Sequence, residues 1–243
     1  MLLIVGLGNP GPNYAGHRHN VGFMALEAIG RHHGFSTWRK RFQGEIAEGI
    51  LNGEKAVALK PMTYMNNSGQ AVGEALRFFK QSPDSLLVLH DELDLAPGKI
   101  KMKRGGGHAG HNGLRSITQH IGPDFRRLRI GIGHPGDKAR VHSYVLGDLP
   151  KGERPHFERL FDAIAEHAGL LTENSEQADN AFTSKVMQAL LSERPPRRAA
   201  PPAAPAQSGA ATSSSGDAGA EGVLARALRN VLGPLAGSRK RDE

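Results

Sequence analysis

Apolar and polar residues alternate along the first 193 positions in a way that predicts short strands separated by helices. Residues 2–6 (LLIVG) form an apolar run typical of a buried strand, and apolar side chains then recur at the helical period over residues 21–29. Residues 44–51 and 55–61 predict two more strands. Because Asn52-Gly53 between them favours a two-residue turn, this pair is expected to form a hairpin.

The same alternation continues to the end of this region. Residues 69–79 and 114–121 have helical periodicity, and two further helical segments follow position 153. Strands are predicted over 86–94, where the strand runs into a loop, and over 99–103 and 127–133. Strands and helices in this mixed order place the chain in the α/β class. We expect a single three-layer α/β/α domain over residues 1–193, with a mixed, largely parallel central sheet.

The composition changes sharply near position 194. Residues 195–220 are rich in Pro, Ala and Ser and contain no aromatic or branched aliphatic side chain, so they cannot bury enough surface to offset their chain entropy. We therefore predict a disordered tail over 194–243. Within it, apolar residues at helical spacing make 221–236 a candidate for a short amphipathic helix.

Charge and cysteine content narrow the functional classes. The chain has 31 Lys and Arg against 24 Asp and Glu, a net charge of +7, which favours anionic partners such as nucleic acid or phosphorylated ligands. The absence of Cys excludes disulfides, thiol nucleophiles and thiolate metal sites, and it suits a reducing cytosol. No apolar run approaches the ~18 residues of a membrane helix, and the first residues lack the basic segment of a signal peptide. We expect a cytoplasmic protein without a membrane span.

Polar side chains gather in four loops that follow strands or precede a helix. In open α/β sheets, binding sites form where loops leave the carboxyl ends of the strands, so these loops are expected to converge. The residues are Asn9, Tyr14 and His19; Tyr64, Asn66 and Asn67; His90, Asp91, Glu92 and Asp94; and His108, His111 and Asn112.

The residue types in these loops favour hydrolysis by an activated water. With no Cys and no Ser in a G-x-S-x-G setting, a covalent nucleophile is not evident. A histidine held by a carboxylate can activate water near neutral pH, and His19 with Asp91 is the candidate pair. Neutral amides can bind a carbonyl and its developing oxyanion without shifting the base, which suits Asn9, Asn66 and Asn112.

Other interpretations of the same loops stay open from the residues alone. His108 and His111 with the acidic residues 91–94 have the ligand types of a zinc or two-metal hydrolase, although the H-E-x-x-H pattern is absent. The glycine-rich stretch 105–113 could bind a phosphate through backbone N–H groups at a helix start. His17 and His90 are interpreted as solvated or structural residues.

Basic residues precede the glycine-rich stretch at alternating positions. Lys99, Lys101 and Lys103 share one face of the predicted strand, and Arg129 lies in the last strand. An edge strand often carries lysines simply to prevent pairing with another chain. Together with the candidate site, a track for RNA phosphates is the preferred interpretation.

Five motifs in order, GLGNPGPNYAGHRHNVG, PMTYMNNSG, HDELDLAPG, GGGHAGHNGLRSI and RLRIGIGHPG, resemble bacterial peptidyl-tRNA hydrolase. The resemblance runs from position 2 to about 192. It implies cleavage of the ester between a peptide and the 3′ ribose of tRNA, by a monomeric enzyme that needs no metal or other cofactor. The tail after about position 194 departs from the compact family pattern, so the resemblance says nothing of it.

The resemblance also assigns roles to residues. His19 matches the general base and Asp91 the acid that holds it, and Asn9 matches a residue that distinguishes N-blocked peptidyl-tRNA from aminoacyl-tRNA. The remaining matches concern binding: Asn66 and Asn112 contact the peptide and acceptor end, Tyr14 and Tyr64 are aromatic tRNA contacts, Lys101, Lys103 and Arg129 meet acceptor-stem phosphates, and Met65 and His111 support the site.

A binding protein without catalysis is the main alternative. Plant organelle splicing factors share this fold and act as RNA-associated proteins, so the fold and the basic charge do not by themselves imply an enzyme. The presence of His19, Asp91 and the three asparagines favours the enzyme.

Overall fold

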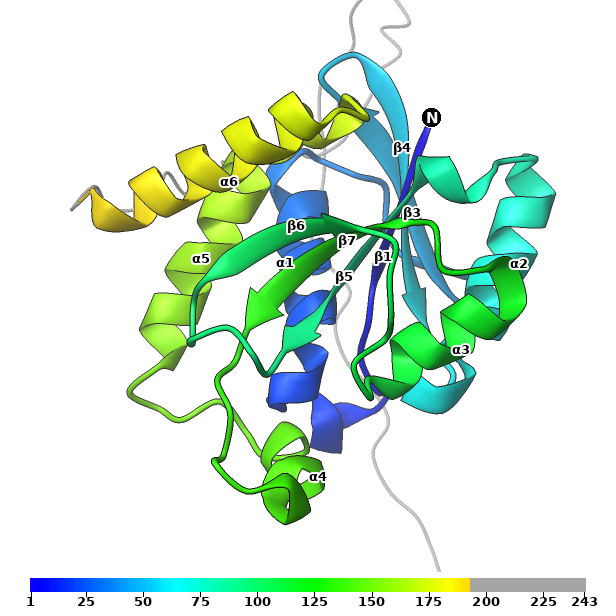
Figure 1. The fold of residues 1–243 in the computed structure, drawn as a ribbon. Helices are drawn as coiled ribbons and strands as arrows, with labels where there is room; N and C mark the ends of the chain where they lie inside the picture. The colour runs from blue at the N-terminus through cyan, green and yellow to red at the C-terminus, as the bar shows by residue number, and fades with distance from the viewer. Residues whose placement is uncertain (193–243) are drawn as a thin grey trace, which may run out of the picture. The chain divides into compact units, whose positions relative to one another are not determined.

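A seven-stranded sheet forms the centre of the computed structural model, which describes residues 1–192 (Figure 1). The strand order is β2-β3-β4-β1-β5-β7-β6. The strands are β1 (Leu2–Gly6), β2 (Arg39–Arg41), β3 (Gly44–Leu51), β4 (Glu54–Pro61), β5 (Leu86–Glu92), β6 (Ile100–Arg104) and β7 (Arg126–Gly131).

The middle of the sheet is parallel and its margins are antiparallel. β4, β1, β5 and β7 pair in parallel, whereas β2 with β3, β3 with β4, and β6 with β7 pair in antiparallel fashion. The hairpin of β3 and β4 turns at Asn52 and Gly53, both with positive φ, as the sequence predicts. The expectation of a mixed sheet with a largely parallel centre is confirmed.

Helices cover both faces of the sheet and give three layers (Figure 1). The helices are α1 (Val21–His32), α2 (Ser68–Phe79), α3 (Asn112–Ile121), α4 (Val141–Val145), α5 (Arg154–His167) and α6 (Glu176–Leu191). Side chains of α1, α5 and α6 form one apolar cluster with the sheet, and those of α2 and α3 form another. Because successive strand residues point to opposite faces, Leu2 and Ile4 belong to the first cluster and Leu3 and Val5 to the second.

Two short elements, β2 and α4, were not expected from the sequence. β2 consists of three basic residues without apolar alternation, and α4 is five residues long, so neither produces a periodic signal. The predicted tail over 194–243 and its candidate helix lie outside the described residues. Among the helices of residues 1–192, none combines the length and the apolar character needed to span a bilayer.

Candidate active site

A cleft of about 550 Å³ opens at the carboxyl ends of the central parallel strands. Its walls come from the loop after β1, the loop after β4, the first turns of α3, and α4. Three of the four polar loops that were expected to converge contribute to these walls, and residues 90–94 do not. The lining residues are Asn9, Tyr14, His19, Tyr64, Met65, Asn66, Asn112, Arg115, His142, Val145 and Leu146.

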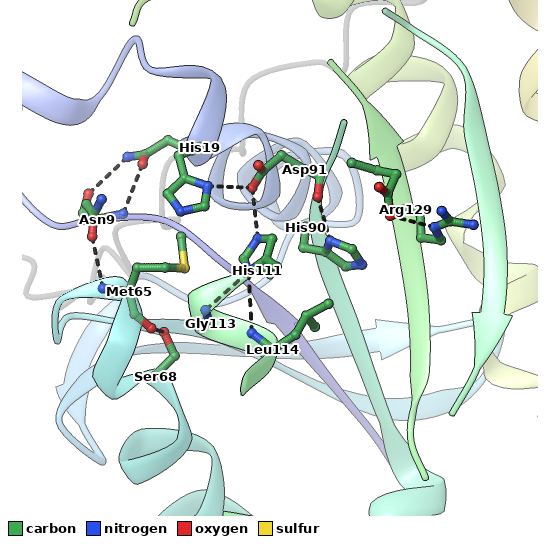
Figure 2. A network of polar contacts seen from close by, with 12 residues as sticks. Asn9, His19, Met65, Ser68, His90, Asp91, His111, Gly113, Leu114 and Arg129 are labelled. Atoms are coloured by element: carbon green, nitrogen blue, oxygen red, sulfur yellow. Dashed lines mark hydrogen bonds and ion pairs between the residues drawn. The ribbon is translucent and has the colours of Figure 1, made fainter. Parts of the chain in front are cut away.

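His19, in the lining of this cleft, and His111 both contact one buried carboxylate behind it (Figure 2). Nδ1 of His19 lies 2.8 Å and Nε2 of His111 lies 3.0 Å from Oδ1 of Asp91. His19 comes from the turn before α1, Asp91 from the end of β5, and His111 from the residue before α3. Because Nδ1 of His19 is bonded to the carboxylate, Nε2 is the ring nitrogen left at the cleft.

Hydrogen bonding fixes the tautomer of His111. Its Nδ1 accepts the backbone N–H groups of Gly113 at 3.1 Å and Leu114 at 3.4 Å, so this side chain caps α3. A nitrogen that accepts a hydrogen bond carries no proton, so the single ring proton resides on Nε2 and is donated to Asp91. His111 thus links the start of α3 to the carboxylate.

The pKa values of the pair move apart. Burial would lower the pKa of His19, but the charge of Asp91 and the hydrogen bond to it raise that pKa above the ordinary value of 6.5. Burial would raise the pKa of Asp91, but His19 and His111 hold it well below the ordinary carboxyl value. Asp91 is therefore ionised at neutral pH and serves as the partner of an imidazole that gains a proton.

Asn9 is held on three sides, which fixes the orientation of its amide. Its backbone N–H donates to Oδ1 of Asn20 at 2.9 Å, and its carbonyl accepts from Nδ2 of Asn20 at 2.9 Å. Its side-chain Oδ1 accepts the backbone N–H of Met65 at 2.9 Å. Since the oxygen is occupied, the Nδ2 donor of Asn9 is the side-chain group available to a ligand in the cleft.

The other predicted site residues divide into two groups. Tyr14, Tyr64, Asn66 and Asn112 line the cleft, and Tyr64 is 63% exposed. Lys101 and Lys103 are exposed on β6, away from the cleft lining.

Arg129 has a carboxylate partner that the sequence did not reveal. Its Nε donates to Oε2 of Glu92 at 2.7 Å, and both side chains are largely buried. This partner lies on the neighbouring strand β5, so it depends on the strand order rather than on sequence spacing. A contact of Arg129 with phosphate would have to form beside this ion pair and stays a prediction.

His90 is buried against the same cluster but is not part of the cleft lining. Its Nδ1 donates to the backbone carbonyl of Asp91 at 2.6 Å, and its ring packs edge-on against His111. Burial, and then the neighbouring His111, lowers the pKa of His90 to about 3. The imidazole is therefore neutral in the folded protein, in agreement with a structural role.

The residues of the metal hypothesis are only partly brought together. Within residues 1–192 the group with metal-ligand geometry is His19, Asp91 and His111, without His108, Glu92 or Asp94. Its two imidazoles already hydrogen-bond to Asp91, and His111 Nδ1 is occupied by α3. The same capping bonds occupy the N–H groups of Gly113, the last residue of the glycine-rich stretch, and of Leu114 after it.

Several residues of the site were missed by sequence reasoning. Asn20 lies in the first motif, but its bonds to Asn9 join two positions of an irregular loop, where spacing carries no periodic signal. Arg115 lies one turn after Asn112 on α3, a spacing that could have indicated a shared face. His142, Val145 and Leu146 belong to or follow the unpredicted α4.

Comparisons with known proteins show which family this chain resembles. The family model described as Peptidyl-tRNA hydrolase matches residues 3–189. Proteins named Peptidyl-tRNA hydrolase from Methylobacterium nodulans and Paracoccus denitrificans are 58% and 59% identical over 190 residues, which cover 78% of this chain and 92% and 81% of theirs. The crystal structure of peptidyl-tRNA hydrolase from Acinetobacter baumannii superimposes with a TM-score of 0.72 at 46% identity, covering 76% of this chain and 95% of that one. The chain therefore belongs to the peptidyl-tRNA hydrolase family, an enzyme family that hydrolyses the ester bond of peptidyl-tRNA.

Proposed function

We propose that this chain hydrolyses peptidyl-tRNA with His19 as a general base that activates water, without a covalent intermediate. The observation that carries the proposal is the hydrogen bond between Nδ1 of His19 and Asp91, which leaves Nε2 as the basic nitrogen at the cleft. The ionised Asp91 holds the ring in this tautomer and stabilises the imidazolium that forms when Nε2 takes a proton from water.

The remaining protons can be followed through the reaction. The hydroxide equivalent attacks the ester carbonyl carbon, and the carbonyl electron pair becomes an oxyanion. When the intermediate collapses, the bond to the 3′ oxygen of the ribose breaks, and the imidazolium of His19 returns its proton to that oxygen. His19 and Asp91 are thereby restored, and free tRNA and an N-substituted amino acid or peptide leave.

Neutral amide donors suit the substrate side of the cleft. The free Nδ2 of Asn9 can donate to a carbonyl of the N-blocked residue or to the oxyanion, and its position is set by Asn20 and Met65. Asn66 and Asn112 add amide groups on the adjoining walls. Their roles in binding the peptide and the acceptor end follow from the family resemblance and are part of the proposal.

The cleft also suits an RNA 3′ end. Tyr14 and Tyr64 have rings on which unpaired bases can stack. Arg115 is a permanent cation in a lining that contains no carboxylate, so it can face a phosphate near the ester. Lys101, Lys103 and Arg129 are proposed to meet phosphates of the acceptor stem.

We further propose that residues 1–193 carry the activity, and that the chain acts as a cytoplasmic monomer without a metal.

Replacing His19 tests the proposal most directly. His19→Ala should lower the single-turnover rate on N-acetyl-aminoacyl-tRNA by about 10²–10⁴-fold, the usual contribution of general acid-base catalysis, while tRNA binding is retained. A wild-type rate in a folded His19→Ala protein would remove His19 as the base. In a parallel arm, the wild-type rate should survive EDTA. Loss of activity that returns on adding Zn²⁺ would favour the metal hypothesis instead.

A further inference from the structure

Two consecutive arginines on β7, Arg126 and Arg127, are both only 1% exposed. Neighbouring residues of a strand point to opposite faces of the sheet, so these two guanidinium groups serve different layers of the fold. Burying a charged group is costly unless it is paired and hydrogen-bonded. Their partners therefore indicate what each buried charge is for.

Arg126 has the partners of a structural residue. It forms an ion pair with Asp179 of α6, and its Nη1 donates to the carbonyl of Leu171 at 2.9 Å. Both contacts are on the face covered by α5 and α6, remote in the chain from every residue that lines the cleft. Arg126 thus joins the sheet to its C-terminal helices.

Arg127 lacks a carboxylate partner among residues 1–192 and donates to three backbone carbonyls instead. Nη1 lies 2.8 Å from the oxygen of Gly107, and Nη2 lies 2.8 Å from that of Gly106 and 3.2 Å from that of Pro123. The guanidinium carbon lies 4.6 Å from the centre of the Phe125 ring. Three carbonyl acceptors shared by two nitrogens of one side chain suit the rigid fork of a guanidinium better than the point charge of a lysine.

The glycines that Arg127 holds belong to the loop that delivers part of the active site. Residues 105–111 connect β6 to α3 without a regular element, and four of them have positive φ: Gly105, Gly106, Ala109 and Gly110. Such a stretch has little conformational preference of its own. It ends at His111, which donates to Asp91, and is followed by Asn112 in the cleft.

We propose that Arg127 is a positioning residue for the hydrolysis, because its guanidinium holds the Gly106–Gly107 segment against the sheet and thereby places His111 on Asp91. The inference rests on the proposed role of the His19–Asp91 pair. It explains why a buried cation with no ion-pair contact among residues 1–192 is kept beside the site, and it assigns different functions to two adjacent arginines of equal burial.

The test compares Arg127→Lys and Arg127→Met with the matched variants Arg126→Lys and Arg126→Met. Arg127→Met should lower kcat by about 10- to 100-fold, the scale expected when a catalytic group is displaced by about 1 Å. Arg127→Lys should restore little of this loss, because an ammonium keeps the charge but cannot hold the three carbonyls together. The Arg126 variants should lower the thermal midpoint yet keep kcat per folded molecule.

Amide hydrogen exchange supplies a readout that does not depend on the reaction. The N–H groups of Gly113 and Leu114, which donate to His111, should exchange faster in Arg127→Lys than in the wild type and in Arg126→Lys. Should Arg127→Met fail to fold, Arg127→Lys carries the test. Wild-type kcat or wild-type exchange in folded Arg127→Lys would overturn the proposal. A failure of His19 as the base would leave the exchange result intact, so the two failures are distinguishable.

Discussion

The cleft wall and the outer edge of the sheet hold their polar groups in opposite ways. At the cleft the polar side chains are held by hydrogen bonds. Asn20 bonds to Asn9, and His111 bonds both to the start of α3 and to the buried Asp91. On β6, Lys101 and Lys103 are exposed and have no ion pair within residues 1–192. Held groups fix a reaction geometry, whereas exposed charges attract a polyanion without fixing it. Substitutions in the two regions should therefore alter different kinetic constants.

Of the two regions, the larger effect is expected from Asp91→Asn, which removes the buried charge behind the cleft. We expect kcat to fall by up to about 10²-fold, since His19 keeps Nε2 but loses the carboxylate that stabilises its imidazolium. Because Asp91 raises the pKa of His19 while burial lowers it, removing the charge should lower this pKa. The acid limb of the kcat profile should then move to lower pH.

The pH profile also separates this role from a purely structural one. A folded Asp91→Asn protein with the wild-type acid limb would show that Asp91 does not set the protonation of His19. The exposed edge supplies the control, because Lys101→Gln should leave the acid limb in place.

His90 differs from its neighbour Asp91 within the buried region. We expect His90 to affect the free energy of unfolding and not the catalytic step. Its pKa in the folded protein is about 3, below the ordinary 6.5, so the unfolded chain binds a proton first as the pH falls. This depressed value makes folding less favourable below about pH 6.5. From pH 7 to pH 5 the cost is about 2 kcal/mol of unfolding free energy.

Urea unfolding of the wild type and His90→Phe at both pH values measures this contribution. The variant removes the titrating imidazole, and the loss of stability between pH 7 and pH 5 should be smaller than in the wild type by about that amount. An equal loss in both proteins would mean that His90 is not the group that takes up the proton.

How far the sequence anticipates the molecule depends on the range of the interaction. The Asn52-Gly53 turn and the apolar faces of α1 and α5 follow from local residue types, and they are found as predicted. The convergence of the loops followed from the α/β pattern. The pairing of Arg129 with Glu92 could not be predicted, because it arises from the neighbouring positions of β5 and β7 in the sheet. The capping bonds of His111 likewise require the actual path of the glycine loop.

The smallest effects are expected at the exposed edge of β6. If Lys101 and Lys103 meet acceptor-stem phosphates, Lys101→Gln and Lys103→Gln should each raise KM for full-length substrate and leave kcat nearly unchanged, because phosphate contacts position RNA without touching the ester. The slope of log affinity against log salt should become shallower by roughly 0.7 to 0.9 for each lost contact. Arg129→Gln should also raise KM, but it leaves Glu92 without its partner, so part of its effect should appear as a lower thermal midpoint.

N-acetyl-aminoacyl-adenosine, which lacks the stem, is the matched control, and the lysine variants should cleave it like the wild type. Equal losses on both substrates would place these lysines with the cleft instead of the RNA track and would remove the distinction between the two regions.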